Sequence, residues 1–241
     1  MKLTVGSLFS GIGGFDLGLE RVGYEIKWQV EIDEYCRKVL AKHWPNVARY
    51  GDITGVDWES VPRVDLLCGG FPCQDLSFAG KRAGIDGARS GLWSEYVRAI
   101  VQLRPRYILV ENVPGLLTNE YMGRVLGDLA ACGYDAEWDC IPASAVGAHH
   151  RRDRVWIVAH RASSSVEKCK VVSQVGLYGQ LRRMGRAALS FDNWQTHQPG
   201  LVGISHGVPH RMDRLKGLGN AVVPQVVEVI GRMIIDSQDK S

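Results

Sequence analysis

Two features are missing from the 241-residue sequence: a long apolar run and a metal-binding pattern of cysteines. No stretch approaches the roughly 18 to 20 consecutive apolar residues that a bilayer span requires. The six cysteines form no CxxC pair and are typical of reduced thiols in a cytosol-like compartment. The N-terminus carries one lysine and then glycines, without the apolar segment of an export signal. We therefore expect a cytoplasmic protein with no membrane-spanning segment and no metal site.

The excess of positive over negative charge is also small, because the net charge is only +3. Its distribution is uneven: residues 146–186 hold 9 Lys/Arg against 2 Asp/Glu, whereas the rest of the chain is neutral or acidic. Attraction to phosphate requires a basic segment of this kind, but a solvated basic surface has the same composition. The charge pattern alone leaves nucleic-acid binding open.

Apolar runs of strand type alternate with longer segments in which apolar residues recur at helical spacing. This alternation predicts an α/β fold, a Rossmann-like, doubly wound and mostly parallel sheet, with ligands at the carboxyl ends of the strands. The predicted strands lie at 3–9, 24–32, 64–70, 107–113, 136–140 and 154–160, and the predicted helices at 16–23, 34–44, 92–105, 121–131 and 223–235.

The periodicity fails over residues 161–206, which are polar and basic with scattered glycines. We predict a main domain over 1–160, a small irregular lobe over 161–206, and a segment over 207–241 that returns to the main domain. Pro224 is expected near the first turn of the last helix, where its missing N–H costs little.

A glycine-rich loop, FSGIGGFDLG, follows the first predicted strand. Asp16 stands where the dinucleotide fingerprint GxGxxG needs its third glycine, so a pyrophosphate ligand is disfavoured. Glu31 ends the second strand, where a carboxylate can accept hydrogen bonds from ribose hydroxyls, and Asp52 can accept from an adenine amino group. The pattern favours an adenosine ligand such as S-adenosylmethionine. A tight turn beside two surface acids is the alternative.

Cys73 lies in the stretch GGFPCQDLSFAG, just beyond the strand at 64–70. Pro72 restricts the backbone ahead of the thiol, and the paired glycines permit a turn with little steric cost. A cysteine that serves only packing needs neither feature. Cys73 is therefore a candidate nucleophile.

A thiol nucleophile needs an electrophile and an acid partner. Glu111, in LVENVPG, follows the next apolar strand and is expected at the same rim of the sheet. Arg152 and Arg154 precede a late strand with a period of two, so both side chains point to one face. They are candidates to pair with Glu111 or to grip a polar substrate edge, although a general phosphate-binding role fits them equally.

Taken together, the motifs of this sequence resemble those of the DNA (cytosine-5) methyltransferase family, of bacterial or phage type, in their order and in their approximate spacing. The resemblance covers residues 3–160 and 207–235, and its most specific part is GGFPCQ together with ENV. The stretches that carry it are FSGIGGFDLGLE, EID, GDIT, GGFPCQDLSFAG, SGLWSEYVRAI, ENVPGLL, HRRDRVWIV and GLGNAVVPQ.

The resemblance implies a methyl transfer from S-adenosylmethionine to C5 of a cytosine swung out of duplex DNA. In this reading Cys73 adds to C6 of the base, and Glu111 holds and protonates N3. Arg154 contacts the cytosine O2, and Arg152 buttresses the acid. Covalent addition divides a difficult step into easier ones, and unstacking the base costs a few kcal/mol.

The same resemblance assigns the main domain to catalysis and cofactor binding, and the small lobe to target recognition. We expect a monomer that binds double-stranded DNA. The cofactor-binding residues are predicted to be Phe9, Ser10, Gly11, Gly13, Glu31, Ile32, Asp52, Ile53, Pro72, Asn220 and Ala221. The residues predicted to contact DNA are Gln74, Ser77, Arg182, Arg183 and Arg186.

The sequence departs from the family pattern at several points. Ser7 stands where the family usually has an aspartate, which bears on cofactor affinity, and His149 and His150 replace the usual Pro-Gln. Only about 45 residues are available for target recognition, and a lobe of this size buries few base edges. We therefore predict a short target sequence.

Two other functions remain compatible with these residues. One is a cytosine-5 methyltransferase that acts on RNA, as one branch of the family does, although the CFT signature of that branch is missing. The other is an inactive cofactor-binding or DNA-binding partner subunit. The joint presence of Cys73, Glu111, Arg152 and Arg154 argues against loss of activity.

Overall fold

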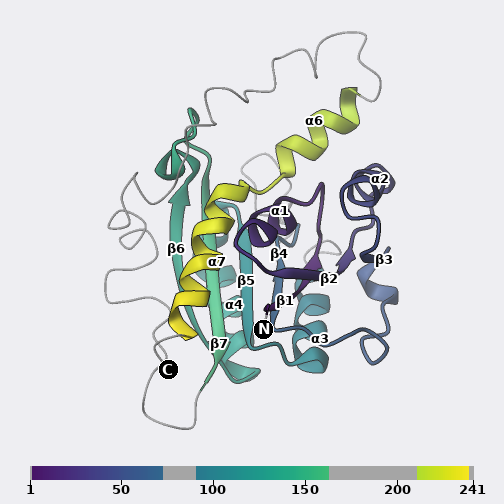
Figure 1. Cartoon of the computed structure of the whole chain (residues 1–241). Coiled ribbons are helices and arrows are strands. Elements are labelled where there is room, and N and C mark those ends of the chain that lie inside the picture. The colour runs from purple at the N-terminus through teal and green to yellow at the C-terminus, as the bar shows by residue number, and fades with distance from the viewer. Residues whose placement is uncertain (1, 73–90, 163–210, 239–241) are drawn as a thin grey trace.

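The computed structural model describes residues 2–72, 91–162 and 211–238 of the chain, which are coloured in Figure 1. Most of the predicted recognition lobe lies outside these ranges. Six predicted site residues lie outside them as well: Cys73, Gln74, Ser77, Arg182, Arg183 and Arg186.

Seven strands of the described residues form one sheet in the order β3-β2-β1-β4-β5-β7-β6. The strands from β3 to β5 in this order are parallel, and β7 is antiparallel to both β5 and β6. The predicted Rossmann-like, mostly parallel sheet is therefore confirmed. The strands are β1 (Thr4–Leu8), β2 (Glu25–Val30), β3 (Ala48–Tyr50), β4 (Leu66–Gly69), β5 (Tyr107–Asn112), β6 (Tyr134–Pro142) and β7 (Asp153–Arg161).

The order of the strands reverses between β1 and β4. From β1 the chain continues to β2 and β3 on one side of the sheet, and it then returns to form β4 and β5 on the other side. The connections that leave the carboxyl ends of β1 and β4 therefore diverge, and a crevice opens between them. This is the position at which doubly wound folds bind ligands.

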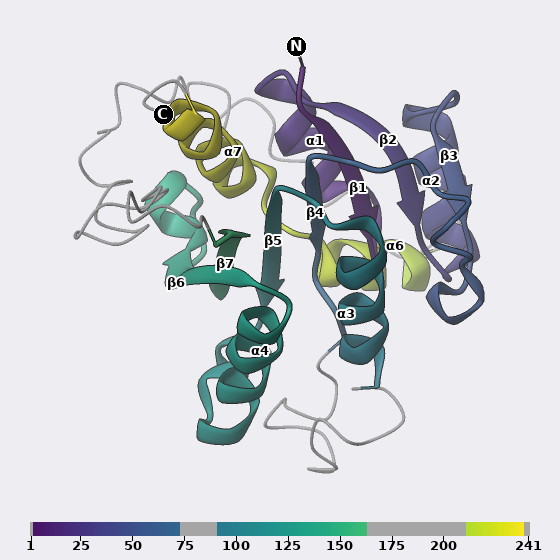
Figure 2. The same ribbon diagram turned by 90° about the horizontal axis from the view of Figure 1, so that it is seen from below.

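Helices cover both faces of the sheet (Figures 1 and 2). Apolar side chains of α3 and α4 contribute to one core cluster, and those of α1 and α7 contribute to another. Figure 2 shows the central strands between these two pairs of helices. The helices are α1 (Gly14–Arg21), α2 (Glu34–His43), α3 (Leu92–Leu103), α4 (Asn119–Ala131), α6 (Arg211–Asn220) and α7 (Pro224–Gln238), and short 3-10 helices lie at η1 (Ile53–Gly55), η2 (Pro114–Leu117) and η3 (Ala143–Val146).

The last helix begins at Pro224, as predicted. By length and composition Met212–Gln238 is apolar enough to cross a membrane. The structure divides this run into α6 and α7, and α7 buries its apolar residues against α1 in the core. Gly18 of α1 allows this close approach, because a Cβ there would lie 2.5 Å from the carbonyl oxygen of Pro224. Helix α6 was not predicted.

Candidate active site

A pocket of about 550 Å³ opens at the carboxyl ends of the parallel strands. Helix α6 and the residues at its end form a further wall. Ten of the predicted site residues line this pocket: Phe9, Gly11, Glu31, Ile32, Asp52, Ile53, Pro72, Glu111, Arg154 and Asn220.

Three predicted cofactor residues do not line it. Ser10 is buried beneath the loop, where its hydroxyl donates to the carbonyl of Ser7 at 3.0 Å. Gly13 and Ala221 line a neighbouring pocket of about 540 Å³, between the start of α1 and the junction of α6 and α7.

The glycine-rich loop turns sharply where it leaves β1. Phe9, Gly11 and Gly13 have φ angles of 51°, 55° and 89°, a region that favours glycine and strains other residues. No atom lies within 4 Å of the position that a Cβ on Gly11 would occupy, so a ligand can approach the backbone there. The amide of Gly11 also donates to Glu31 Oε2 at 2.7 Å, which ties the loop to the end of β2.

Glu31 is held by backbone amides on both carboxylate oxygens. In addition to the bond from Gly11, its Oε1 accepts from the amide of Asp33 at 2.8 Å. Ile32, the residue between them, is 68% exposed and lines the pocket. This arrangement suits a nucleoside, because the base can pack on the side chain of Ile32 while the ribose hydroxyls donate to the carboxylate of Glu31.

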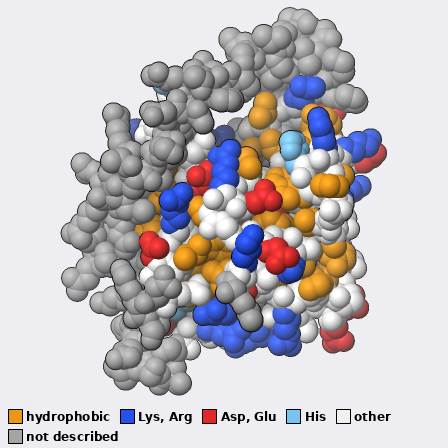
Figure 3. Space-filling view, viewed as in Figure 1, with side chains coloured by type: hydrophobic (Ala, Val, Ile, Leu, Met, Phe, Trp, Pro, Cys, Tyr) orange, Lys and Arg blue, Asp and Glu red, His pale blue; other side chains and the backbone are white. Residues whose placement is uncertain are grey.

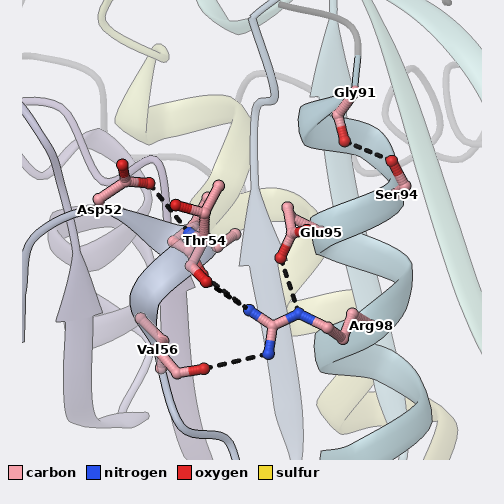
Figure 4. Close-up of polar contacts among 8 residues, drawn as sticks. Asp52, Thr54, Val56, Gly91, Ser94, Glu95 and Arg98 are labelled. Carbon is pink, nitrogen blue, oxygen red and sulfur yellow. Dashed lines mark hydrogen bonds and ion pairs between the residues drawn. The ribbon is translucent and has the colours of Figure 1, made fainter. Parts of the chain in front are cut away.

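Asp52 follows the neighbouring strand β3, immediately before η1, and lines the same pocket. Its side chain accepts from the amide of Thr54 at 2.9 Å (Figure 4). This backbone hydrogen bond is the main reason that the pKa of Asp52 is lowered, so the group is a carboxylate at neutral pH. The side chain of Arg98 braces η1 from α3.

Ser7 does not line the pocket. It is fully buried, and its hydroxyl donates to Asp16 Oδ2 at 3.0 Å. Gln29 donates to the other oxygen of Asp16 at 2.8 Å. Burial raises the pKa of Asp16 to about 6, although both hydrogen bonds act to lower it. This buried cluster of Ser7, Asp16 and Gln29 was not predicted from the sequence, in which Asp16 only argues against a dinucleotide.

Glu111 and Arg154 form an ion pair in the pocket, with Arg154 Nε 2.9 Å from Glu111 Oε1. Pairing of Asn112 with Val155 in the β5–β7 ladder brings Arg154 to the end of β5. The side chains are only 11% and 21% exposed, respectively. Burial raises the pKa of Glu111 to about 7, while the charges of Arg154 and Arg152 oppose this shift. Glu111 can therefore hold a proton near neutral pH.

The chain that leads to Cys73 is anchored beside Glu111. The side-chain amide of Asn112 donates to the carbonyl of Phe71 at 3.2 Å. Phe71 is buried and its ring lies 5.1 Å from that of Trp93. These contacts fix the backbone up to Pro72, which lines the same pocket as Glu111. Cys73 itself is not among the described residues.

Arg152 forms its hydrogen bonds with the junction of α6 and α7. Its Nη2 donates to the carbonyls of Gly219 and Ala221, both at 2.8 Å. The charge of Arg152 acts with that of Arg154 to lower the pKa of Glu111, and the predicted support of the acid by Arg152 stays a prediction. His149 and His150 are exposed.

Four arginines of the basic segment lie in the described part of the chain: Arg151, Arg152, Arg154 and Arg161. Two of them are committed to the contacts above. On the face seen in Figure 3, Lys and Arg side chains gather at the lower edge and elsewhere lie among acidic ones. The described residues thus leave the phosphate-binding role of this segment a prediction.

The strand order and the pocket at the switch point define an α/β protein of the doubly wound class, in which this edge of the sheet is the usual place for a ligand. The chain belongs to the C-5 cytosine-specific DNA methylase family, whose sequence profile matches residues 3–182. This confirms the resemblance drawn from the motifs.

Two relatives are named as methyltransferases. The type II methyltransferase M2.BsuMI of Bacillus subtilis is 40% identical over 167 residues, which cover 65% of this chain and 42% of the relative. The orphan methyltransferase M.SPRI of Bacillus phage SPR is 34% identical over 168 residues, 66% of this chain and 38% of the relative. The chain thus spans less than half of the length of these curated relatives.

Solved structures share the fold. A protein described as a prophage-encoded DNA modification methyltransferase of E. coli matches 99% of this chain and 100% of its own, with a TM-score of 0.67 and 18% identity. A Spodoptera frugiperda DNMT2 mutant matches 68% of this chain and 51% of its own, with a TM-score of 0.58 and 24% identity. At these identities the likeness concerns the fold alone.

Proposed function

We propose that the chain is a DNA (cytosine-5) methyltransferase that transfers a methyl group from S-adenosylmethionine to a flipped-out cytosine in duplex DNA. The observation that carries this proposal is one pocket shared by two groups of side chains. Glu31 and Asp52 suit an adenosine, and the buried pair of Glu111 and Arg154 suits a pyrimidine edge beside Pro72. Membership of the family supports the same reaction.

The residues fit S-adenosylmethionine by chemistry and by space. Glu31 would accept from the ribose hydroxyls, Asp52 from the adenine amino group, and Ile32 would cover a face of the base. The uncovered backbone at Gly11 leaves room for the methionine portion. When bound, S-adenosylmethionine supplies the electrophilic methyl group. Ser10, Gly13 and Ala221 would support this site from behind its wall, and Phe9, Ile53, Pro72 and Asn220 from within it.

The protein's own groups would prepare the cytosine. The thiolate of Cys73 would add to C6, and the π electrons of the C5–C6 double bond would shift to C5 and, through C4, to N3. Glu111 would protonate N3 and so neutralise the charge that this addition creates, while Arg154 would bind O2. After methylation, the C5 proton would pass to solvent water, its electron pair would re-form the C5–C6 double bond, and the Cys73 thiolate would leave C6 while N3 returns its proton to Glu111.

The pKa of Glu111 is suited to this role. A carboxyl group of ordinary pKa would be ionised at neutral pH and would hold no proton to donate. Burial among the strands provides the shift, and Arg154 limits it, so that the group exchanges a proton near the working pH.

The DNA contacts proposed for Gln74, Ser77, Arg182, Arg183 and Arg186 concern residues outside the described ranges. We propose that they bind double-stranded DNA and that the small lobe recognises a short target. A monomer and a cytoplasmic location remain predictions; among the relatives, bacterial and phage enzymes are compatible with the location.

The test is a transfer assay with labelled S-adenosylmethionine and either duplex DNA or tRNA, run in parallel with Cys73→Ala. Label that enters DNA and disappears with the variant is the expected result. Label in tRNA alone would indicate the RNA enzyme, and label in neither would indicate an inactive binding subunit. A duplex that carries 5-fluorocytosine should trap a covalent adduct, because fluorine cannot leave as the proton does.

A further inference from the structure

Arg98 of α3 lies outside the predicted site, yet it makes several contacts behind the pocket wall (Figure 4). Its Nε is 2.7 Å from Glu95 Oε2, three residues earlier on the same helix. Its guanidinium lies 5.7 Å from the centre of the Trp58 ring. The ion pair and the ring together restrict the orientation of the guanidinium plane.

The remaining donors of Arg98 reach the turn that follows Asp52. Nη1 donates to the carbonyl of Val56 at 3.1 Å, and Nη2 donates to the carbonyl of Ile53 at 2.9 Å. Nη2 also lies 3.5 Å from the carbonyl of Thr54. One side chain thus bonds to the carbonyl of the first residue of η1 and to that of the residue after η1, and lies near the carbonyl of Thr54.

A turn as short as η1 has little means of fixing itself. It spans only Ile53–Gly55, and a single 3-10 turn forms few internal hydrogen bonds. Asp52 and Ile53 at its start line the pocket, and Asp52 also caps the turn through the amide of Thr54. The direction of the Asp52 carboxylate therefore depends on what holds η1, and the observed support from α3 is Arg98.

We propose that Arg98 is a positioning residue, which sets the affinity and the adenine preference of the pocket by holding η1 and hence the carboxylate of Asp52. This inference rests on the proposed function, because it assigns the adenosine of S-adenosylmethionine to that wall. The planar fork is essential to the role: lysine would keep the charge, but one ammonium cannot hold carbonyls along the turn in fixed directions.

The first experiment measures binding of S-adenosylhomocysteine to the full chain by calorimetry. Arg98→Ala should weaken binding about tenfold and Arg98→Lys by nearly as much, because a tenfold loss corresponds to about 1.4 kcal/mol. In the transfer assay the KM for S-adenosylmethionine should rise while kcat stays within about twofold of the parent value. Arg124→Ala is the matched control, since Arg124 pairs with Asp128 on α4 away from the pocket.

The second experiment tests whether Arg98 acts through Asp52. In a double-mutant cycle with Asp52→Ala, replacing Arg98 should change affinity less than about twofold. S-inosylhomocysteine lacks the adenine amino group, so it should bind more weakly than S-adenosylhomocysteine. Because it cannot donate to Asp52, Arg98→Ala should not change its affinity. If Arg98→Ala instead damaged the structure elsewhere, it would weaken the binding of both ligands, and its effect on the binding free energy would add to that of Asp52→Ala.

The outcomes separate the inference from the function on which it rests. No binding of S-adenosylhomocysteine by the parent protein would refute the proposed cofactor. Two results would refute the role of Arg98 and leave the proposed cofactor intact. One is that Arg98→Ala binds S-adenosylhomocysteine as tightly as the parent protein does. The other is that Arg98→Ala weakens the binding of S-adenosylhomocysteine and S-inosylhomocysteine equally. If Arg98→Ala does not fold, Arg98→Lys provides the same comparison.

Discussion

The carboxyl group of Glu111 and the guanidinium of Arg154 lie 2.9 Å apart at the end of the β5–β7 pair, largely shielded from solvent. Two opposing effects meet at this carboxyl group. Removal from water favours its neutral form, whereas the adjacent cation favours the ionised form. Burial is the larger effect, and the pKa rises to about 7. The pair therefore combines a proton donor with a fixed cation in one small volume.

Transfer should depend on the protonated form of Glu111. Because its pKa is raised to about 7, the acid form persists through mildly acidic pH and is lost as the pH rises through that value. With DNA and cofactor saturating, kcat should decline about tenfold per pH unit on the alkaline side. Glu111→Gln should lower kcat by about 10²- to 10⁴-fold and abolish this limb of the profile. An alkaline limb that survives in Glu111→Gln would assign the titration to another group.

Arg154→Gln should shift the alkaline limb of the pH–rate profile to higher pH while lowering the rate at pH 7. Removing the cation leaves burial unopposed, so the pKa of Glu111 should rise and the acid form should persist to higher pH. The variant should therefore be slower at pH 7, because it loses the proposed contact to O2, but should keep its activity to a more alkaline pH. A pH–rate profile with an unshifted midpoint would show that Arg154 does not tune the acid.

Gly70→Ala should impair catalysis through sterics alone. A Cβ at position 70 would lie 2.8 Å from Glu111 Oε2, so the carboxyl group must move. A displacement of about 1 Å in a reacting group can cost about 100-fold in rate, and we expect a loss of kcat of that order. Gly123→Ala on α4 is the matched control, because no atom lies within 4 Å of its Cβ position. Equal kcat values for the two variants would contradict the prediction.

Much of the fold and part of the site could be predicted from the sequence. The alternation of strands and helices predicts the sheet, and chain direction alone brings the ends of β1, β2, β4 and β5 to one edge. Residues at those ends, such as Glu31 and Glu111, were therefore predictable. The hydrogen bonds of Arg98 to η1 and of Arg152 to the α6–α7 junction were not, because both arginines bind backbone carbonyls there, which every residue has. Asp16 was missed since an acid near a helix start is typical of an exposed residue.

Asp16 should leave a signature in the pH dependence of stability. Its pKa is 3.8 in an unfolded chain and about 6 when folded, so the folded state holds the proton more tightly between these values. The contribution of Asp16 to the free energy of unfolding is therefore largest at low pH and is lost as the pH rises through about 6. The difference of about two pKa units corresponds to about 3 kcal/mol.

Denaturant unfolding at pH 4.5 and pH 7 measures this effect, with Asp16→Asn as the reference that does not titrate. The stability of the parent relative to the variant should fall by about 2 kcal/mol between the two pH values, which is most of the full effect. A difference that stays constant, or that grows with pH, would mean that Asp16 is ionised throughout the range.

For Arg152, the sequence and the structure predict different effects of a substitution. If its main role were to support Glu111, Arg152→Ala would chiefly shift the pH profile of kcat. The hydrogen bonds to Gly219 and Ala221 instead flank Asn220, which lines the pocket. Their loss should free this segment, so we expect the affinity for S-adenosylhomocysteine to fall about tenfold, with a lower melting temperature. Arg151→Ala is the control, since that exposed neighbour pairs with Asp153. A shifted pH profile with unchanged affinity would favour the role expected from sequence.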